Sequence, residues 1–169
     1  MHERLMGFTH PTDLTLNLVW RSALSNAEGE ALWALQQQAY RVEADLIGCA
    51  DFLPLRETVN DILGARENFL LAYDHKQLAG ALSYTTGEPG CHICRLVVAP
   101  SYFRRGIARW MLHNLLLSAD PALPCRVVTA QANHPAIALY HSLGFAPALY
   151  FASQDCVDLV QLLRPAPAL

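Results

Sequence analysis

The chain has 169 residues, of which 53% are hydrophobic and 16% charged, so it can form one hydrophobic core and is not a disordered or low-complexity chain. Twelve Lys and Arg against fifteen Asp and Glu give a net charge of −3, which argues against a general binder of nucleic acid or of anionic membranes. No uncharged apolar run approaches the roughly 18 residues of a membrane span, and the N-terminal residues contain no apolar stretch of signal-peptide length. We therefore expect a soluble cytoplasmic protein.

The first half of the chain predicts a strand, two helices and two more strands. Alternating apolar residues over 14–20 are typical of a strand. Ser25 and Glu28 have the spacing of a capping box, and the helix that follows ends at Gly48. The apolar stripe of this helix is Leu32, Leu35, Ala39, Val42 and Leu46. A shorter helix over 55–66 turns Val59, Ile62 and Leu63 inward, and strands follow over 69–73 and 78–85.

The second half predicts an alternation of strands and helices after a turn rich in Gly and Pro. We expect strands over 93–99, 126–131, 148–152 and 157–163, with helices over 105–118 and from Pro135 to Gly144. The fold class is therefore α+β (mixed α/β), with a mixed sheet flanked by helices. The whole chain, 1–169, forms one domain, and residues 1–13 and 165–169 are predicted to be flexible ends.

The chain has five cysteines, at positions 49, 91, 94, 125 and 156. Because their number is odd and they are scattered along the chain, we expect reduced, buried thiols. Cys91 and Cys94 are spaced like half of a zinc site, but a second Cys or His pair at similar spacing is absent. A redox pair needs its first cysteine at the start of a helix, whereas a strand follows here. We predict no metal site.

One segment has the character of an anion site. Residues 96–109 predict a buried strand that ends at Pro100, then a short loop with Arg104 and Arg105, then the start of a helix. Gly106 lets a ligand approach the backbone, and the free N–H groups of the first helical turn attract anions. Neither of the common nucleotide fingerprints is present. By itself, the segment is equally compatible with a solvated basic helix start.

A second segment, 130–145, decides between these interpretations. It reads Ala-Gln-Ala-Asn-His-Pro-Ala-Ile-Ala-Leu-Tyr-His-Ser-Leu-Gly-Phe, with Asn133, Tyr140 and Gly144 at the spacing N-x-x-A-x-x-x-Y…G-F. Together with the loop before it, this segment resembles the GNAT superfamily of acyl-CoA-dependent N-acyltransferases. The resemblance covers about residues 78–163. It implies a mostly antiparallel twisted sheet of about seven strands with about four helices, and a V-shaped splay between the fourth and fifth strands.

The resemblance also implies where acetyl-CoA would bind. Backbone groups of the fourth strand would pair with the pantetheine arm, the loop would hold the pyrophosphate, and Asn133 would orient the pantetheine. Phe103 stands where the family usually has Gln or Arg, a position for which neighbouring Arg104 is a substitute. The cofactor-binding residues implied are Leu96, Val97, Val98, Phe103, Arg104, Arg105, Gly106, Ile107, Ala108, Arg109, Asn133 and Tyr140.

The catalytic residues implied are an acid and a base. Tyr140 would protonate the departing thiolate, because a phenol with a pKa near 10 keeps its proton at neutral pH. Its alternative role is that of an aromatic residue on the inner face of its helix. The strands over 93–99 and 126–131 carry no carboxylate, so the base is sought in the first two helices. Glu43 is the leading candidate, ahead of His92 and Glu57, and its alternative role is a solvated helix carboxylate.

These residues predict an N-acetyltransferase that transfers an acetyl group from acetyl-CoA to a primary amine by direct attack in a ternary complex. The acceptor is a small-molecule amine or a protein N-terminus, and the loop over 49–54 is expected to line its site. The alternative is a non-catalytic acyl-CoA-binding sensor or regulatory module; a plain nucleotide-binding domain is a weaker third. By analogy with the family, the terminal strands offer an edge for a homodimer.

Overall fold

The computed structural model describes residues 15–155 and 157–168. The strands in this part are β1 (Leu16–Arg21), β2 (Asn68–Asp74), β3 (Gln77–Thr86), β4 (Cys91–Val98), β5 (Cys125–Ala130), β6 (Ala146–Ala152) and β7 (Asp158–Arg164). The helices are α1 (Asn26–Ile47), α2 (Val59–Gly64), α3 (Ile107–Ser118) and α4 (His134–Ser142), with short 3₁₀ turns η1 (Leu53–Arg56) and η2 (Pro100–Tyr102). The predicted fold class and its seven-stranded sheet are confirmed for these residues.

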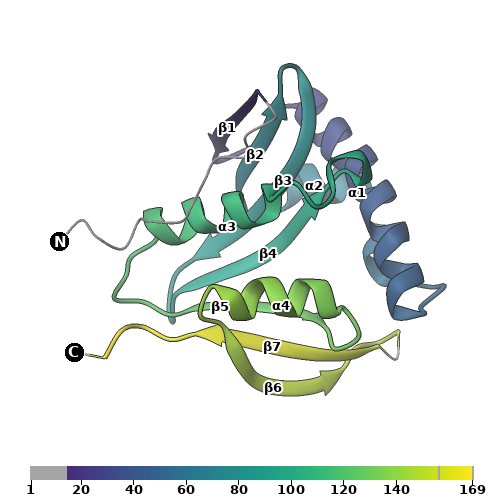
Figure 1. The fold of residues 1–169 in the computed structure, drawn as a ribbon. Helices are drawn as coiled ribbons and strands as arrows, with labels where there is room; N and C mark the ends of the chain where they lie inside the picture. The colour runs from purple at the N-terminus through teal and green to yellow at the C-terminus, as the bar shows by residue number, and fades with distance from the viewer. Residues whose placement is uncertain (1–14, 156, 169) are drawn as a thin grey trace.

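The sheet has the order β1-β2-β3-β4-β5-β7-β6, and its neighbouring strands are antiparallel except for β4 and β5. α3 and α4 lie on one side of the sheet, and α1 and α2 on the other (Figure 1). β5, β6 and β7 form a separate lower part of the sheet in this view, joined to the upper part only through β4 and β5. The connection between the two parts is therefore the critical feature of the fold.

β4 and β5 pair over only three residues, Cys91 to Ile93 on β4 with Cys125 to Val127 on β5. Beyond this point β5 continues to pair with β7, and β4 continues to pair with β3. The separation coincides with a β-bulge in β4: Arg95 pairs with Ser83 and Ile93 with Tyr84, so that Cys94 is the extra residue. Because a bulge bends its strand and increases the local twist, it turns β4 away from β5. The predicted splay is confirmed.

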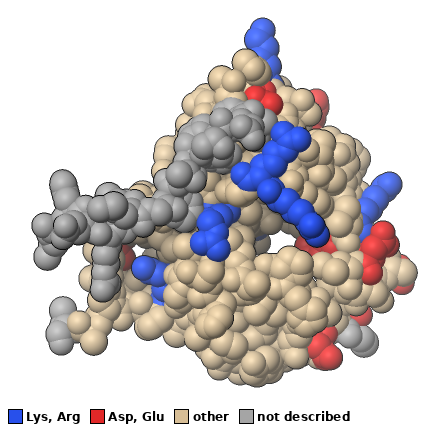
Figure 2. Space-filling model, in the orientation of Figure 1, with Lys and Arg blue, Asp and Glu red and all other residues tan. Residues whose placement is uncertain are grey.

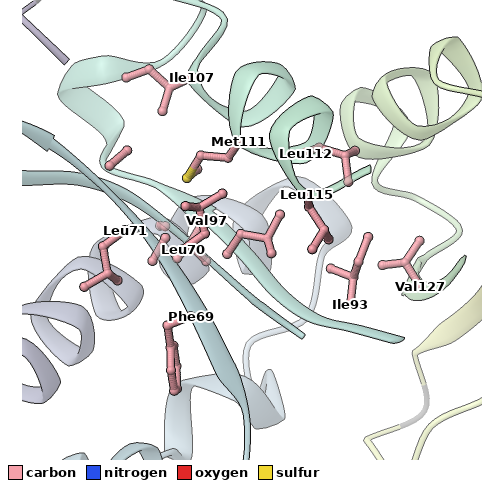
Figure 3. Packing of buried hydrophobic residues seen from close by; sticks show 14 of the residues in the cluster. Phe69, Leu70, Leu71, Ile93, Val97, Ile107, Met111, Leu112, Leu115 and Val127 are labelled. Carbon is pink, nitrogen blue, oxygen red and sulfur yellow. The ribbon is translucent and has the colours of Figure 1, made fainter. Parts of the chain in front are cut away.

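The core lies on both faces of the sheet, and one part of it fills the space between α3 and the strands. Met111, Leu112 and Leu115 of α3 point toward the strands and are at most 1% exposed, and Ile93 and Val127 lie side by side beneath the helix (Figure 3). These two residues belong to the last pair before β4 and β5 separate. The core under α3 therefore includes the last pair before the splay and continues along β4 to Val97.

α1 begins and ends as the sequence predicts. Ser25 and Glu28 form the capping box, and Gly48 closes the helix in the left-handed conformation, with φ of 70°. The predicted stripe is correct for Leu32, Leu35 and Ala39. It is wrong for Val42 and Leu46, which are 43% and 50% exposed. The inward face of the last turns consists instead of Ala39, Tyr40, Glu43 and Ala44, because that end of α1 faces the splay rather than the apolar sheet.

The second helix is shorter than the predicted 55–66. Pro54 lies in the 3₁₀ turn η1, and Thr58 then starts α2 with its own capping box to Asp61. The Thr58 N–H donates to the Asp61 carboxylate, and the Asp61 N–H donates to the Thr58 hydroxyl. These two hydrogen bonds fix the start of α2 at Thr58, so η1 and α2 do not form one continuous helix. Ile62 is buried as predicted.

The expectation of buried thiols is correct for Cys91 and Cys125, but Cys94 in the bulge is exposed and Cys49 is half-buried. Cys156 lies outside the described residues, as do the predicted flexible residues 1–13. Residues 165–168 follow β7 without regular structure. Over residues 15–155 and 157–168, no helix has both the length and the apolar character that crossing a bilayer requires.

A buried cluster of ionic hydrogen bonds connects the bulged strand β4 to the side of the sheet that α1 and α2 cover. Arg95, only 9% exposed, donates to both carboxylate oxygens of Glu67, at 3.0 and 3.1 Å, and to Glu57 at 2.8 Å. It also donates to Gln36 of α1 at 2.7 Å and to Ser83 of β3 at 2.9 Å. Arg95 thus joins α1, the η1–α2 connection and the start of β2 at one guanidinium group.

We predict that Arg95→Met lowers the free energy of unfolding by about 3 kcal/mol, because the apolar stem is kept while two partly buried carboxylates lose their partner. Arg21→Met is the matched control. It breaks an ion pair whose arginine is 41% exposed, and should cost less than about 1 kcal/mol. Urea denaturation of both variants measures the difference. Equal losses would show that the Arg95 cluster contributes no more than a surface pair.

Candidate active site

A cavity of about 410 Å³ lies between β4, α3 and α4. It is visible as a hollow between α3 and α4, with Lys and Arg side chains along its upper edge (Figure 2). None of its lining residues in the described part of the chain is acidic. Many of the residues predicted to bind the cofactor line this cavity: Leu96, Val98, Phe103, Arg104, Gly106, Ile107, Ala108, Arg109 and Tyr140. The cavity therefore combines apolar walls with a basic opening.

The basic opening is the N-terminus of α3. Gly106 is the N-cap with φ of 81°, and a Cβ atom there would meet nothing within 4 Å. No side chain caps the helix, so the backbone N–H groups of its first turn have no partner among the residues described. Arg104 and Arg109 line the cavity, and Arg109 donates to Ser142 of α4 at 2.6 Å. These amides and guanidinium groups form a site for an anion.

The wall opposite α3 is the open edge of β4. The N–H of Ala99 donates to Ala79 of β3 at 2.8 Å. Because successive amides of a strand alternate in direction, those of Leu96 and Val98 point toward the gap that β5 leaves. Both residues line the cavity. Val97 does not line it: its amide points toward β3, and its side chain is buried at 4% exposure. β4 thus offers an unpaired backbone edge to an extended ligand.

A second, smaller cavity of about 190 Å³ lies inside the splay itself. It is lined by the ends of both separated strands, by α1 and by the η1 segment. Leu96, Ala136 and Tyr140 line both cavities. A ligand in the larger cavity and a ligand in the smaller one would therefore meet at Leu96 and Tyr140.

Glu43 lies in the smaller cavity, and its solvated alternative is wrong. Its Oε1 accepts a hydrogen bond of 3.1 Å from the side-chain amide of Asn133, 90 residues later in the chain. Asn133 also caps α4, because its Oδ1 accepts from the N–H of Ala136. Burial raises the pKa of Glu43, and the Asn133 hydrogen bond offsets part of that increase. A buried carboxylate with a raised pKa is a stronger base than a surface one.

Tyr140 is 5% exposed and packs edge-on against Phe145, with ring centroids 5.4 Å apart. Its ring lies on the inner face of α4 and lines both cavities, a position compatible with either of the two roles predicted for it. Its hydroxyl has no hydrogen-bond partner within the described residues. Burial raises its pKa, and the nearby charge of Glu43 raises it further. Tyr140 therefore keeps its proton over the physiological pH range.

The structure separates the other candidates from the site. The Glu57 carboxylate accepts from Arg95 and Gln36 and lines neither cavity. His92 also lines neither, and burial lowers its pKa. Arg105 lies over the Tyr102 ring at 5.6 Å instead of in the cavity. Asn133 remains in the site, where it lines the smaller cavity beside Glu43 and does not line the larger one.

In the predicted acceptor loop, Phe52 and Pro54 line the smaller cavity. Four lining residues were not predicted, namely Tyr40 in this cavity and Pro135, Ala136 and Leu139 in the larger one. The α4 residues could have been predicted, because positions 135, 136, 139 and 140 lie on one face of a helix and Tyr140 was already placed in the site. Nothing in the sequence singles out Tyr40 from the apolar stripe beside it.

Residues 20–145 match the model of the acetyltransferase (GNAT) family. The chain belongs to this family. It is 38% identical over 115 residues to the UPF0157 protein YqkA of Bacillus subtilis, a match that covers 68% of this chain and 34% of that protein. The chain thus spans about a third of the length of this relative.

Solved structures of GNAT proteins share the fold. The ribosomal-protein-S18-alanine N-acetyltransferase of Escherichia coli is 19% identical with a TM-score of 0.65, covering 90% of this chain and 96% of its own. The PaiA N-acetyltransferase of Thermoplasma acidophilum, solved in complex with coenzyme A, is 16% identical with a TM-score of 0.68, covering 86% and 98%. The family and the fold that the two motifs implied are confirmed.

We predict that Asn133→Ala lowers the free energy of unfolding by about 1 kcal/mol, because α4 loses its N-cap. The same change should raise the pKa of Glu43 further, because the hydrogen bond that stabilises its carboxylate is removed. Urea denaturation and a carboxyl-detected NMR titration measure the two effects. Thr58→Ala, which removes the cap of α2, is the control, and it should cost similar stability and leave Glu43 unchanged. A constant Glu43 pKa in Asn133→Ala would contradict the assigned contact.

Proposed function

We propose that this chain transfers the acetyl group of acetyl-CoA to a primary amine by direct attack in a ternary complex. The observation that carries the proposal is the meeting of two cavities at Tyr140. One has an anion site and an unpaired strand edge, and the other contains a buried carboxylate. This division matches the two substrates of an acetyl transfer, a long anionic thioester and an amine.

Acetyl-CoA fits the larger cavity in one direction. Its pyrophosphate would accept hydrogen bonds from the first-turn amides of α3, with Arg104 and Arg109 beside them. Its pantetheine arm would pair with Leu96 and Val98 as an added strand does, and its thioester would then reach Tyr140. Phe103, 41% exposed, lines this cavity and supplies an apolar contact where the family usually has a polar one.

The reaction would begin when Glu43 accepts a proton from the bound ammonium group. The amine nitrogen then attacks the thioester carbon, a C–N bond forms, and the oxyanion of the tetrahedral intermediate accepts a hydrogen bond from a backbone N–H of β4 near Val98. The C–S bond breaks as the carbonyl re-forms, the thiolate takes the proton of the Tyr140 hydroxyl, and the resulting phenolate takes the remaining extra proton of the attacking nitrogen. Glu43 releases its proton to water, so the products are an amide, coenzyme A and one proton.

We predict that acetyl-CoA and CoA raise the temperature midpoint of unfolding, and that ATP at the same concentration does not. At about a hundred times Kd, the ligand adds about 2.7 kcal/mol, which is about 5–10 °C for a chain of this size. Differential scanning fluorimetry measures the shift. The double variant Arg104→Ala, Arg109→Ala should weaken binding at least about tenfold. The exposed Arg66→Ala is its control. No shift with either CoA ligand would contradict the proposal.

The second prediction concerns catalysis. Glu43→Gln and Tyr140→Phe should each lower kcat by about 100-fold or more, because each removes a proton-transfer group, while the acetyl-CoA shift is kept. In the wild type, kcat should fall as the pH falls through the raised pKa of Glu43, since only the ionised carboxylate accepts a proton. Besides Glu43, the charged side chain that lines this cavity is Arg95, which is paired with Glu57 and Glu67. The phenols that line it are Tyr40 and Tyr140.

Release of free thiol from acetyl-CoA, measured against pH with a panel of amines, gives both results. The acid limb should disappear in Glu43→Gln. Acetyl-CoA binding without turnover on any amine would favour the alternative function, a sensor of acyl-CoA. An unchanged kcat in Tyr140→Phe would remove Tyr140 from the role of acid.

A further inference from the structure

Two cysteines lie opposite each other at the closed end of the splay, where β4 and β5 are still paired. Cys91 is the first residue of β4 and Cys125 is the first residue of β5, and the two form the first of the three pairs that join these strands. Because residues two apart on a strand point to the same face, both thiols point to the face of Ile93 and Val127, beneath α3 (Figure 3). The two thiols are therefore neighbours on one face of the sheet.

The backbone around this pair is closely packed. Neighbouring strands lie about 4.8 Å apart, which is within the roughly 4.4–6.8 Å that separates the Cα atoms of disulfide-bonded cysteines. The N–H of Cys91 donates to the carbonyl oxygen of Pro124 at 3.0 Å. A Cβ atom at Gly90 would collide with the same oxygen, so the residues that precede the two cysteines are in contact as well. The strands thus begin side by side, at a separation that a disulfide can span.

The two sulfurs differ in acidity, and Cys91 is the one that ionises. Hydrogen bonding from the Cys125 thiol lowers the pKa of Cys91, against the effect of burial. The same contact, together with burial, raises the pKa of Cys125. A thiolate is the nucleophile in cysteine oxidation, and a neighbouring thiol can then convert the oxidised sulfur into a disulfide. The pair therefore has an attacking cysteine, Cys91, and a resolving cysteine, Cys125.

Both sulfurs are buried, with Cys91 6% exposed and Cys125 3% exposed. Each cysteine nevertheless follows a turn whose residues are exposed, 86–89 before Cys91 and 121–123 before Cys125. Opening the end of a strand costs less free energy than unfolding the whole domain. A small oxidant can therefore reach the pair from the side of the two turns.

We propose that Cys91 and Cys125 form a reversible disulfide that cross-links β4 and β5 at the closed end of the splay, with a hydroperoxide as the oxidant. Three residue pairs join the strands there, and the disulfide adds a covalent bond to the first of them. Because it closes the loop from residue 91 to residue 125, it also restricts the unfolded chain. Oxidation strengthens the connection between the two parts of the sheet.

The reaction with hydrogen peroxide balances in two steps. The Cys91 thiolate attacks one oxygen and the O–O bond breaks, which gives a sulfenic acid on Cys91 and a hydroxide ion that takes up the former thiol proton as water. The Cys125 sulfur then attacks the sulfenic sulfur, an S–S bond forms and the S–O bond breaks. The hydroxide leaves with the Cys125 proton as a second water. Two thiols lose two electrons in total, and one peroxide is reduced to two waters.

The disulfide is tested by treating the folded protein with hydrogen peroxide. Cys94→Ser serves as the background, because trypsin leaves Cys91 and Cys94 in one peptide, 77–95, and Cys125 in another, 110–126. After alkylation of the remaining thiols in urea, we expect the two peptides to be linked and lighter by two hydrogen atoms than the sum of the reduced peptides. Dithiothreitol should separate them, and Cys125→Ala in the same background should give no linked peptide.

Refolding gives a second route to the same bond, which does not depend on access to the folded site. The reduced Cys94→Ser protein is unfolded in urea and refolded in a buffer of oxidised and reduced glutathione. A link that forms only on refolding would overturn the oxidation of the folded protein by peroxide. If the link forms in neither treatment, the two sulfurs do not meet at this pair and the proposal is wrong.

The disulfide should also stabilise the paired ends of β4 and β5. We expect oxidation to raise the temperature midpoint of unfolding by about 5 °C or more and to slow amide hydrogen exchange over 91–93 and 125–127 at least about tenfold. Cys125→Ala, treated with peroxide in the same way, should show neither change. A linked protein with the midpoint and exchange rates of the reduced protein would overturn the stabilising role of the disulfide.

Acetyl-CoA binding should be the same in both redox states. Leu96 and Val98, which line the larger cavity, lie beyond the last of the three pairs. The acetyl-CoA thermal shift is therefore expected to be equal in the reduced and the linked protein. Loss of the shift on linking would overturn the placement of the cross-link outside the cofactor site. Absence of the shift in both forms would count against the proposed function alone.

Discussion

The early separation of β4 from β5 is the constraint on which the rest of this structure depends. Three residue pairs hold the two strands together, and the bulge at Cys94 then turns β4 away. A continuous sheet would satisfy the backbone of both strands and would leave no gap. Here the amides of Leu96 and Val98 are left facing the gap, at the junction of both cavities or beside it. An open strand edge elsewhere promotes aggregation, whereas under the proposed function this edge pairs with the pantetheine arm of acetyl-CoA.

Keeping two strands apart requires support on both sides of the gap. On the side of α1, the Arg95 cluster fixes β4 to Gln36, Glu57 and Glu67. Across the gap, the hydrogen bond between Asn133 and Glu43 connects the N-terminus of α4 to α1. The bulged strand β4 and the helix α4 are thus each connected to α1. A buried ion cluster is costly to desolvate, so its value here lies in placing the elements more than in net stability.

Much of the fold follows from local sequence signals. The capping box of Ser25 and Glu28, Gly48 at the end of α1 and the period-two strands are each decided by residues a few positions apart, and the structure agrees with them. The start of the second helix was misplaced although Thr58 and Asp61 carry a capping box of their own. The apolar spacing over 55–63 favours a helix that starts at Leu55, whereas the capping box starts it after Thr58.

What could not be predicted depends on contacts between distant segments. Val42 fits the apolar stripe as well as Leu35 does, but the sheet no longer lies beneath the end of α1, so Val42 is exposed and Glu43 is turned inward. The bulge depends on the register between β3 and β4, which no local pattern encodes. The contact of Glu57, a lower-ranked candidate for the base, with Arg95 was not predictable for the same reason, because the two residues are 38 positions apart.

The most direct test of this account is a crystal structure with a non-hydrolysable analogue of acetyl-CoA. We expect its pyrophosphate within hydrogen-bond distance of the amides of Ile107, Ala108 and Arg109, its pantetheine along Leu96 and Val98, and its acyl group next to Tyr140. The smaller cavity would remain free for the amine. An analogue bound elsewhere, or one whose acyl group lies away from Tyr140 and Glu43, would contradict the division of the splay between two substrates.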